Sequence, residues 1–220
     1  MGEINLSYVA LGDSLSVGIG TSRFEPGFVP RYKRYLECEF KQGIPLFVFA
    51  RSGFKTVDVL KVLENEPIQK VIRESEIITI TAGGNDLIDA TKKFQLEDDD
   101  GVFLEALAAS QINYAKLLKK INEVKKDCGH KYVIRIVNLY NPFPEIQLAN
   151  KWINKFNHHI KKSEKYLGVR VADVYSAFLS HEQEYLSYDK VHPNSKGYLV
   201  IAETIQNLGI DGLHKNTSWN

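Results

Sequence analysis

Two motifs carry side chains that together could perform acyl transfer. Ser14 follows the apolar run Tyr8–Leu11, at the point where a buried strand would end. Asp189 and His192 stand three residues apart near the C-terminus. In a turn, that spacing lets the Asp189 carboxylate reach Nδ1 of His192 and leaves Nε2 free to accept a proton from a serine hydroxyl. Ser14 would then act as a nucleophile toward a carbonyl carbon.

Candidate hydrogen-bond donors for a developing oxyanion follow two further apolar runs. Asn85, within Gly83–Leu87, carries a side-chain amide, and Gly53 offers a backbone N–H. Together with the N–H of Ser14, these groups could stabilise negative charge on one oxygen. Asp86 can accept hydrogen bonds that fix the loop. Each motif alone is also typical of a turn or a helix N-cap.

A parallel sheet would bring these motifs together, because ligands bind at the carboxyl ends of its strands. Short apolar, β-branched runs alternate with segments of helical spacing, which indicates βαβ units. No repeat or linker interrupts the pattern, so we expect a single domain over residues 1–220. The expected strands are Leu6–Leu11, Leu46–Ala50, Ile77–Ala82, Tyr132–Leu139 and Val169–Val171. The expected helices span residues 28–42, 56–73, 101–127, 145–166 and 194–207.

The composition is that of an ordinary globular protein. The chain has 220 residues, of which 44% are hydrophobic and 25% are charged. Its net charge of +1 provides no global field for nucleic acid or an anionic membrane. The pairs Lys119–Lys120 and Lys125–Lys126 are expected on a solvated helix face. We therefore expect no nucleic-acid partner and, without an apolar stretch of about 20 residues, no stable membrane insertion.

Metal ions and cofactors are not indicated. Cys38 and Cys128 are too far apart in the sequence for a metal cluster, and we expect free thiols, with a disulfide left open. The acidic run Glu97–Asp100 lacks the alternating spacing of a calcium loop and is interpreted as an exposed loop. Gly18–Gly20 lacks the third glycine of a dinucleotide loop.

The first residues of the chain indicate where in the cell the protein is expected. Met1–Asn5 contains no basic segment followed by a long apolar run of the kind that directs secretion. This favours a cytoplasmic location and leaves open whether a leader was removed. The sequence does not indicate an oligomeric state.

In order and in position relative to the strands, the motifs resemble those of the SGNH hydrolase superfamily, also called GDSL lipases and esterases. The first block corresponds to Gly12–Leu15, the second to Gly53, the third to Gly83–Asp86 and the last to Asp189–His192. The resemblance spans nearly the whole chain. It implies a flavodoxin-like, three-layer α/β/α fold with a parallel sheet of about five strands in the order 2-1-3-4-5.

The resemblance also implies a role for each site residue. Ser14 would be the nucleophile, His192 the general base and then acid, and Asp189 its orienting carboxylate. The oxyanion hole would consist of the N–H groups of Ser14 and Gly53 and the side-chain amide of Asn85. The residues before Gly53 lack the asparagine often seen in relatives, which weakens the second block.

The expected function is hydrolysis of carboxylic esters by a lipase-, esterase- or lysophospholipase-like acylhydrolase. One alternative is an acyltransferase or deacetylase acting on a sugar or alcohol, and another is a catalytically silent binding module. The expected partner is a small-molecule ester, with acyl lipids among the candidates. Six apolar side chains are open to two interpretations, as an acyl-chain pocket or as core: Leu87, Ile88, Tyr140, Phe143, Tyr175 and Phe178.

Overall fold

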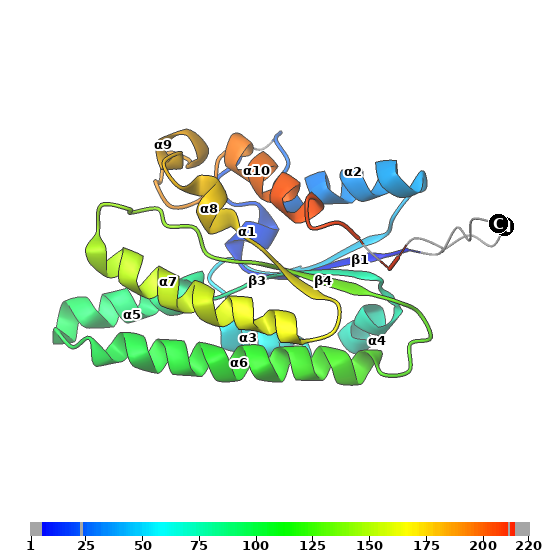
Figure 1. The fold of residues 1–220 in the computed structure, drawn as a ribbon, viewed down its shortest axis with the longest axis horizontal. Helices are drawn as coiled ribbons and strands as arrows, with labels where there is room; N and C mark the ends of the chain where they lie inside the picture. Colours follow the sequence, from blue (N-terminus) through cyan, green and yellow to red (C-terminus); the bar gives the residue numbers. More distant parts are fainter. Residues whose placement is uncertain (1–5, 23, 211, 214–220) are drawn as a thin grey trace.

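Five short apolar segments form one parallel sheet in the computed structural model, which describes residues 6–22, 24–210 and 212–213. The strand order β2-β1-β3-β4-β5 confirms the expected topology (Figure 1). Met1–Asn5, which bear on the predicted location, lie outside the described residues. The strands are β1 (Tyr8–Gly12), β2 (Leu46–Ala50), β3 (Ile77–Thr81), β4 (Val133–Val137) and β5 (Val169–Ala172).

Helices cover both faces of the sheet and give the expected three-layer α/β/α arrangement (Figure 1). One layer contains α1 (Ser14–Val17), α2 (Phe28–Phe40), α8 (Val174–Phe178), α9 (Glu182–Tyr185) and α10 (Ser195–Gln206). The other contains α3 (Thr56–Val62), α4 (Glu66–Glu74), α5 (Gly84–Glu97), α6 (Gly101–Lys125) and α7 (Gln147–Lys161), which continues into the 3₁₀ turn η1 (Lys162–Lys165).

Alternating side chains of the strands supply two hydrophobic cores, one for each helical layer. On β1, Tyr8 and Ala10 pack with α2 and α10, whereas Val9 and Leu11 pack with the helices on the opposite face. This follows from the two-residue period of a strand, and it explains why strands covered on both faces are apolar throughout. The edge strand β2 differs, because its Val48 is 45% exposed.

The helices differ from the sequence-based expectation at residues 56–73 and at Gly83–Leu87, and the short helices α1, α8 and α9 were not predicted either. The predicted helix over 56–73 is divided into α3 and α4, because the Asn65 side chain accepts a hydrogen bond from the N–H of Ile68 and starts a new helix. The helix α5 was not predicted, since Gly83–Leu87 had the composition of a turn. The structure shows that this motif is the start of a helix 14 residues long.

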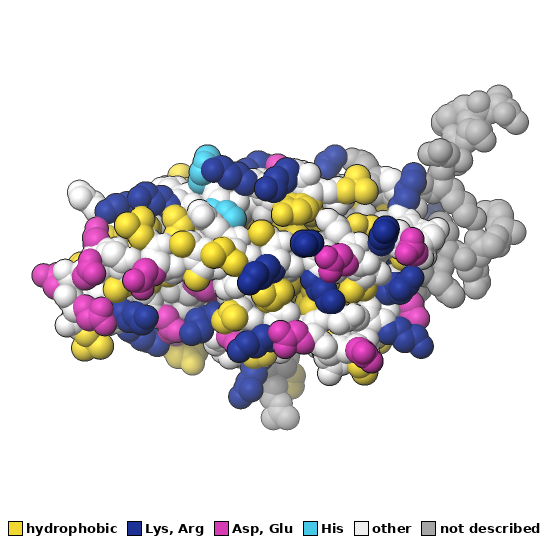
Figure 2. Space-filling view, turned by 90° about the horizontal axis from the view of Figure 1, so that it is seen from below, with side chains coloured by type: hydrophobic (Ala, Val, Ile, Leu, Met, Phe, Trp, Pro, Cys, Tyr) yellow, Lys and Arg dark blue, Asp and Glu magenta, His cyan; other side chains and the backbone are white. Residues whose placement is uncertain are grey.

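Charged side chains of both signs mix on the outer face of the layer that contains α6. Figure 2 shows Lys and Arg interspersed with Asp and Glu on this face. Such mixing gives no extended field of one sign there. In the part of the chain that the structure describes, no helix is both long enough and apolar enough to span a membrane.

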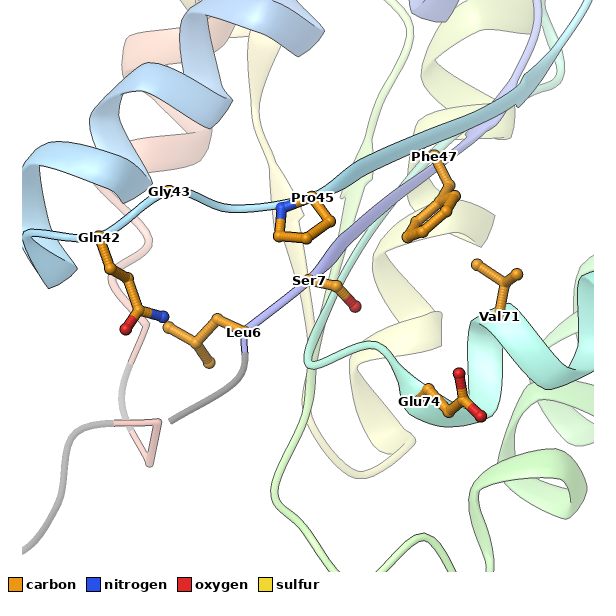
Figure 3. Close-up of a pocket in the computed structure, with 8 residues that line it drawn as sticks. All are labelled: Leu6, Ser7, Gln42, Gly43, Pro45, Phe47, Val71 and Glu74. Atoms are coloured by element: carbon orange, nitrogen blue, oxygen red, sulfur yellow. The ribbon is translucent and has the colours of Figure 1, made fainter. Parts of the chain in front are cut away.

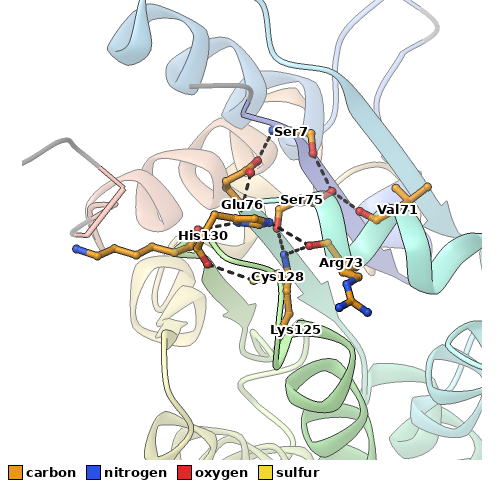
Figure 4. A network of polar contacts seen from close by, with 9 residues as sticks. Ser7, Val71, Arg73, Ser75, Glu76, Lys125, Cys128 and His130 are labelled. Atoms are coloured by element: carbon orange, nitrogen blue, oxygen red, sulfur yellow. Dashed lines mark hydrogen bonds and ion pairs between the residues drawn. The ribbon is translucent and has the colours of Figure 1, made fainter. Parts of the chain in front are cut away.

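The pair Lys125–Lys126 is divided by the fold. Lys126 is exposed, but Lys125 is only 2% exposed, so the prediction of a solvated face is wrong for Lys125. Its ammonium group donates to the carbonyl of Arg73 at 3.1 Å and to that of Ser75, where α4 ends (Figure 4). The last carbonyls of a helix lack intrahelical partners and favour a cation. Lys125 therefore joins the end of α6 to the end of α4.

Replacing this lysine tests its structural role. Lys125→Met is expected to lower the free energy of unfolding by about 2 to 3 kcal/mol, because it removes the ammonium donor to the carbonyl of the buried Ser75 and to that of Arg73. Lys126→Met, on the exposed neighbour, should change it by less than about 0.5 kcal/mol. Urea denaturation of both variants measures the difference, and equal midpoints would contradict the assignment.

Candidate active site

Ser14 lies at the carboxyl end of the inner strand β1, in the first turn of α1. The side chain of Asp13 accepts a hydrogen bond from the N–H of Leu15 at 3.0 Å and so caps this short helix. Gly12 has a φ of +153°, a value that favours glycine, and lets the chain leave the strand abruptly. Ser14 is 8% exposed, so little of the residue is in contact with solvent.

A turn between α9 and α10 places His192 and Asp189 beside this serine. Nε2 of His192 lies 3.0 Å from Oγ of Ser14, and Nδ1 lies 2.7 Å from Oδ2 of Asp189. With the Nδ1 proton donated to the carboxylate, Nε2 is an acceptor for the hydroxyl proton of Ser14. The three side chains that the sequence placed at opposite ends of the chain therefore form one chain of hydrogen bonds.

The second oxygen of the Asp189 carboxylate is held by its own turn. Oδ1 accepts hydrogen bonds from the Ser187 hydroxyl at 2.8 Å, the N–H of Val191 at 2.9 Å and the N–H of His192 at 2.8 Å. Partial burial disfavours the ionised carboxyl, but the hydrogen bonds from His192, Val191 and Ser187 outweigh it and hold the pKa of Asp189 well below its ordinary value. Asp189 is therefore ionised at neutral pH.

Three residues outside the sequence motifs support this turn. Tyr140 donates its hydroxyl proton to the carbonyl of Val191 at 2.6 Å. Asn194 caps α10 and donates from Nδ2 to the carbonyls of Glu184 and Leu186. At Gly20, a Cβ atom would lie 2.7 Å from Cβ of His192, so only glycine lets this loop pack against the histidine. Sequence reasoning gave these residues no such roles, because each contact joins separate segments.

The candidate oxyanion donors lie at the carboxyl ends of the strands next to β1. Asn85 is in the first turn of α5, and its Nδ2 donates one proton to the carbonyl of Phe54 at 2.9 Å. This bond fixes the amide and leaves its second N–H for another acceptor. Gly53, with a φ of +87°, lies in the turn after β2, where the N–H of Arg51 donates to the carbonyl of Gly12. That these donors converge on one oxygen stays a prediction.

Asp86 fixes the loop as the sequence suggested. Its carboxylate accepts hydrogen bonds from the N–H and the hydroxyl of Thr56, at 2.9 and 2.7 Å. The start of α5 is thereby tied to the start of α3. Burial raises the pKa of Asp86 above its ordinary value, although the bonds from Thr56 oppose that rise. Asp86 thus holds the neighbouring Asn85 in place.

The six apolar candidates for an acyl pocket divide into core and surface. Phe178 is fully buried and stacks on Tyr140 with ring centroids 4.6 Å apart, so both belong to the core. Leu87 is also buried, and Tyr175 is partly buried against the core. Ile88 and Phe143 remain 41% and 37% exposed.

A hollow of about 640 Å³ lies at the opposite edge of the sheet from Ser14. Leu6 and Pro45, which precede β1 and β2, line it together with Val71 and Glu74 of α4 (Figure 3). In a parallel sheet this amino edge is remote from the carboxyl end of β1, where Ser14 lies. The hollow is therefore not part of the candidate active site.

Neither cysteine belongs to this arrangement. Cys38 is exposed, Cys128 is partly buried, and both are free thiols. In the acidic run, Asp100 forms an ion pair with Lys151 at 3.0 Å. Across the described residues, no three His, Cys, Asp or Glu side chains form a group that would hold a metal ion.

Comparison with known proteins identifies relatives over nearly the whole chain. Residues 10–200 match the GDSL-like lipase/acylhydrolase family. The chain is 45% identical over 206 residues to the spore germination lipase LipC of Bacillus licheniformis, covering 94% of this chain and 97% of that protein.

Solved structures agree with this match. The crystal structure of the lipase Lip_vut3 from a goat rumen metagenome is 45% identical, has a TM-score of 0.91, and covers 95% of this chain and 100% of that chain. A variant of Axe2, an acetyl xylan esterase from Geobacillus stearothermophilus, shares the fold, with a TM-score of 0.68 at 17% identity. That match covers 97% of this chain and 100% of the Axe2 chain. The chain therefore belongs to the GDSL-like lipase/acylhydrolase family and is an ester-hydrolysing enzyme.

Proposed function

We propose that this enzyme hydrolyses carboxylic esters of acyl lipids through an acyl-enzyme on Ser14. The observation that carries the proposal is the hydrogen-bond chain from Ser14 through His192 to Asp189, with distances of 3.0 and 2.7 Å. A serine hydroxyl is a weak nucleophile, and an adjacent base that is oriented by a carboxylate activates it.

In the first half of the reaction, Oγ of Ser14 attacks the ester carbonyl carbon while Nε2 of His192 takes the hydroxyl proton. The ionised Asp189 stabilises the imidazolium that forms. The carbonyl oxygen becomes an oxyanion, for which the N–H groups of Ser14 and Gly53 and the Asn85 amide are the proposed donors. The tetrahedral intermediate collapses, the bond to the alcohol oxygen breaks, and His192 gives its proton to the departing alcohol.

In the second half, water takes the place of the alcohol. His192 removes a proton from the water, and the resulting hydroxide attacks the acyl carbon bound to Ser14. A second tetrahedral intermediate collapses, the ester bond to Oγ breaks, and His192 returns the proton to Ser14. The products are one carboxylic acid and one alcohol, and the enzyme regains its starting protonation state.

Two observations support a lipid-type acyl group. The relatives at 45% identity are both named lipases. Ile88 follows Asn85 by three residues on α5, so the two side chains lie on the same face of the helix, and Ile88 is 41% exposed. An exposed apolar side chain next to the proposed oxyanion donor is suited to contact the acyl chain of a bound ester.

Product analysis with a series of p-nitrophenyl esters tests the proposal. The enzyme is incubated with esters from acetate to long-chain acyl groups, in water and in water with added ethanol. We expect free carboxylic acid as the main product in both, with higher kcat/KM for acyl groups longer than acetyl. Transfer of most acyl groups to ethanol would indicate an acyltransferase, and absence of turnover with every ester would contradict hydrolysis.

A further inference from the structure

A buried cluster of polar side chains lies directly behind Ser14. Thr81 is the last residue of β3, and it is 1% exposed. Asp13 and Ser16, on either side of Ser14 in the sequence, are each 4% exposed. Burying a polar group without a hydrogen-bond partner is costly, so the hydrogen bonds among these side chains fix their positions relative to one another.

The Thr81 hydroxyl is at the centre of this cluster. It accepts a hydrogen bond from the N–H of Asp13 at 3.1 Å and donates its own proton to Oδ1 of Asp13 at 2.8 Å. A third contact, at 2.9 Å, joins it to Oγ of Ser16. The same Oδ1 accepts the N–H of Leu15 at 3.0 Å. Asp13, which precedes Ser14, and Ser16, two residues after it, are therefore bonded to one hydroxyl group on the neighbouring strand.

The strand register explains why a side chain takes this role. The pairing of β1 with β3 ends at Leu11 and Ile80, so Asp13 has no backbone partner on β3. Its N–H bonds to the Thr81 side chain instead. The approach is close, because a Cβ atom at Gly12 would lie 2.1 Å from Oγ1 of Thr81. The glycine thus serves this contact as well as the exit from the strand.

The Asp13 carboxyl depends on the same contacts. Burial raises the pKa of Asp13 above its ordinary value, and the hydrogen bonds from Thr81 and Leu15 oppose the rise. Without the Thr81 hydroxyl, Asp13 would lose a donor to Oδ1 and the acceptor of its N–H. Both losses loosen the turn that carries the nucleophile.

We propose that Thr81 is a positioning residue for ester hydrolysis, whose hydroxyl holds Asp13 and Ser16 and thereby orients Oγ and the N–H of Ser14. The inference rests on the proposed role of Ser14 as nucleophile. Misplacement of a reacting group by about 1 Å can lower a rate about 100-fold, so the role predicts an effect on kcat rather than on substrate binding.

The experiment compares three substitutions on β3. Thr81→Val keeps the shape of the side chain and removes the hydroxyl, whereas Thr81→Ser keeps the hydroxyl. Thr79→Val is the matched control, because Thr79 is fully buried on the same strand and its hydroxyl contacts the Tyr8 hydroxyl at 2.7 Å, away from Ser14. Kinetics with p-nitrophenyl acetate give kcat and KM, and circular dichroism gives the melting temperature.

For Thr81→Val we expect kcat to fall by about 10- to 100-fold with KM within about twofold of the wild type. Thr81→Ser should restore most of kcat, and Thr79→Val should keep it despite a lower melting temperature. Wild-type kcat in Thr81→Val, or an equal loss in Thr79→Val, would overturn the proposal. If Thr81→Val does not fold, Thr81→Cys is measured in its place, because a thiol is only a weak hydrogen-bond donor. A wild-type kcat in Thr81→Cys would then overturn the positioning role of Thr81.

The result also separates this role from the catalytic proposal. Undiminished turnover in Ser14→Ala would contradict the nucleophile and leave Thr81 without a function in the reaction. An inactive Ser14→Ala beside a fully active Thr81→Val would contradict only the positioning role.

Discussion

Ser14→Ala is expected to lower kcat for p-nitrophenyl acetate by at least about 10⁴-fold, because no other group would form the acyl-enzyme. The hydroxyl is hydrogen-bonded to His192, and its removal leaves the hydrogen bonds that fix Asp13 and Asp189 in place. The melting temperature should therefore stay close to that of the wild type. Initial rates at saturating ester and circular dichroism measure both quantities.

Ser22→Ala is the matched control for this variant. Ser22 is exposed, and its hydroxyl bonds to the side chain of Glu25 in a surface loop. The same chemical change there should leave kcat unchanged. A folded Ser14→Ala protein that retains more than about a tenth of the wild-type rate would contradict a serine nucleophile at this position.

Asp189→Asn should lower kcat by about 10⁴-fold while leaving the fold intact. Oδ1 of Asp189 accepts three donors, from Ser187, Val191 and His192, so the asparagine oxygen will take that position. Its NH₂ group then faces Nδ1 of His192 and can only donate. The imidazole is forced to carry its proton on Nε2, where it can no longer accept the proton of Ser14.

Asp127→Asn provides the control for this change, because Asp127 is an exposed residue just after α6. It should retain wild-type kcat. Steady-state kinetics of the two variants, with thermal melts, measure the difference. Asp189→Asn with a rate within about tenfold of the wild type would show that the carboxylate does not orient His192.

The sheet could be predicted from sequence because a buried strand has a recognisable local composition. Runs such as Ile77–Ala82 are apolar and β-branched, and both faces of the strand are covered by helices. Local composition was misleading at Gly83–Leu87, where small and polar residues start α5. It also failed for Lys125, since a lysine pattern on a helix does not reveal that a neighbouring helix end supplies carbonyl partners.

For the site, the motifs predicted which side chains meet but not what holds them. Ser14, His192 and Asp189 belong to recognisable blocks, and their hydrogen bonds follow from the fold. Thr81 and Tyr140 act through contacts between segments that lie far apart in the sequence. Such contacts depend on strand register and helix packing, which cannot be read from the types of the residues next to Thr81 or Tyr140 in the sequence.

Trapping the acyl-enzyme tests the central claim most directly. The wild-type enzyme is mixed with p-nitrophenyl acetate, quenched with acid before turnover is complete, digested and analysed by mass spectrometry. We predict one acetyl group on the peptide that contains Ser14, and none on that peptide in Ser14→Ala. Acetylation of a different residue, or rapid release of p-nitrophenol without any acetylated peptide, would contradict catalysis through an acyl group on Ser14.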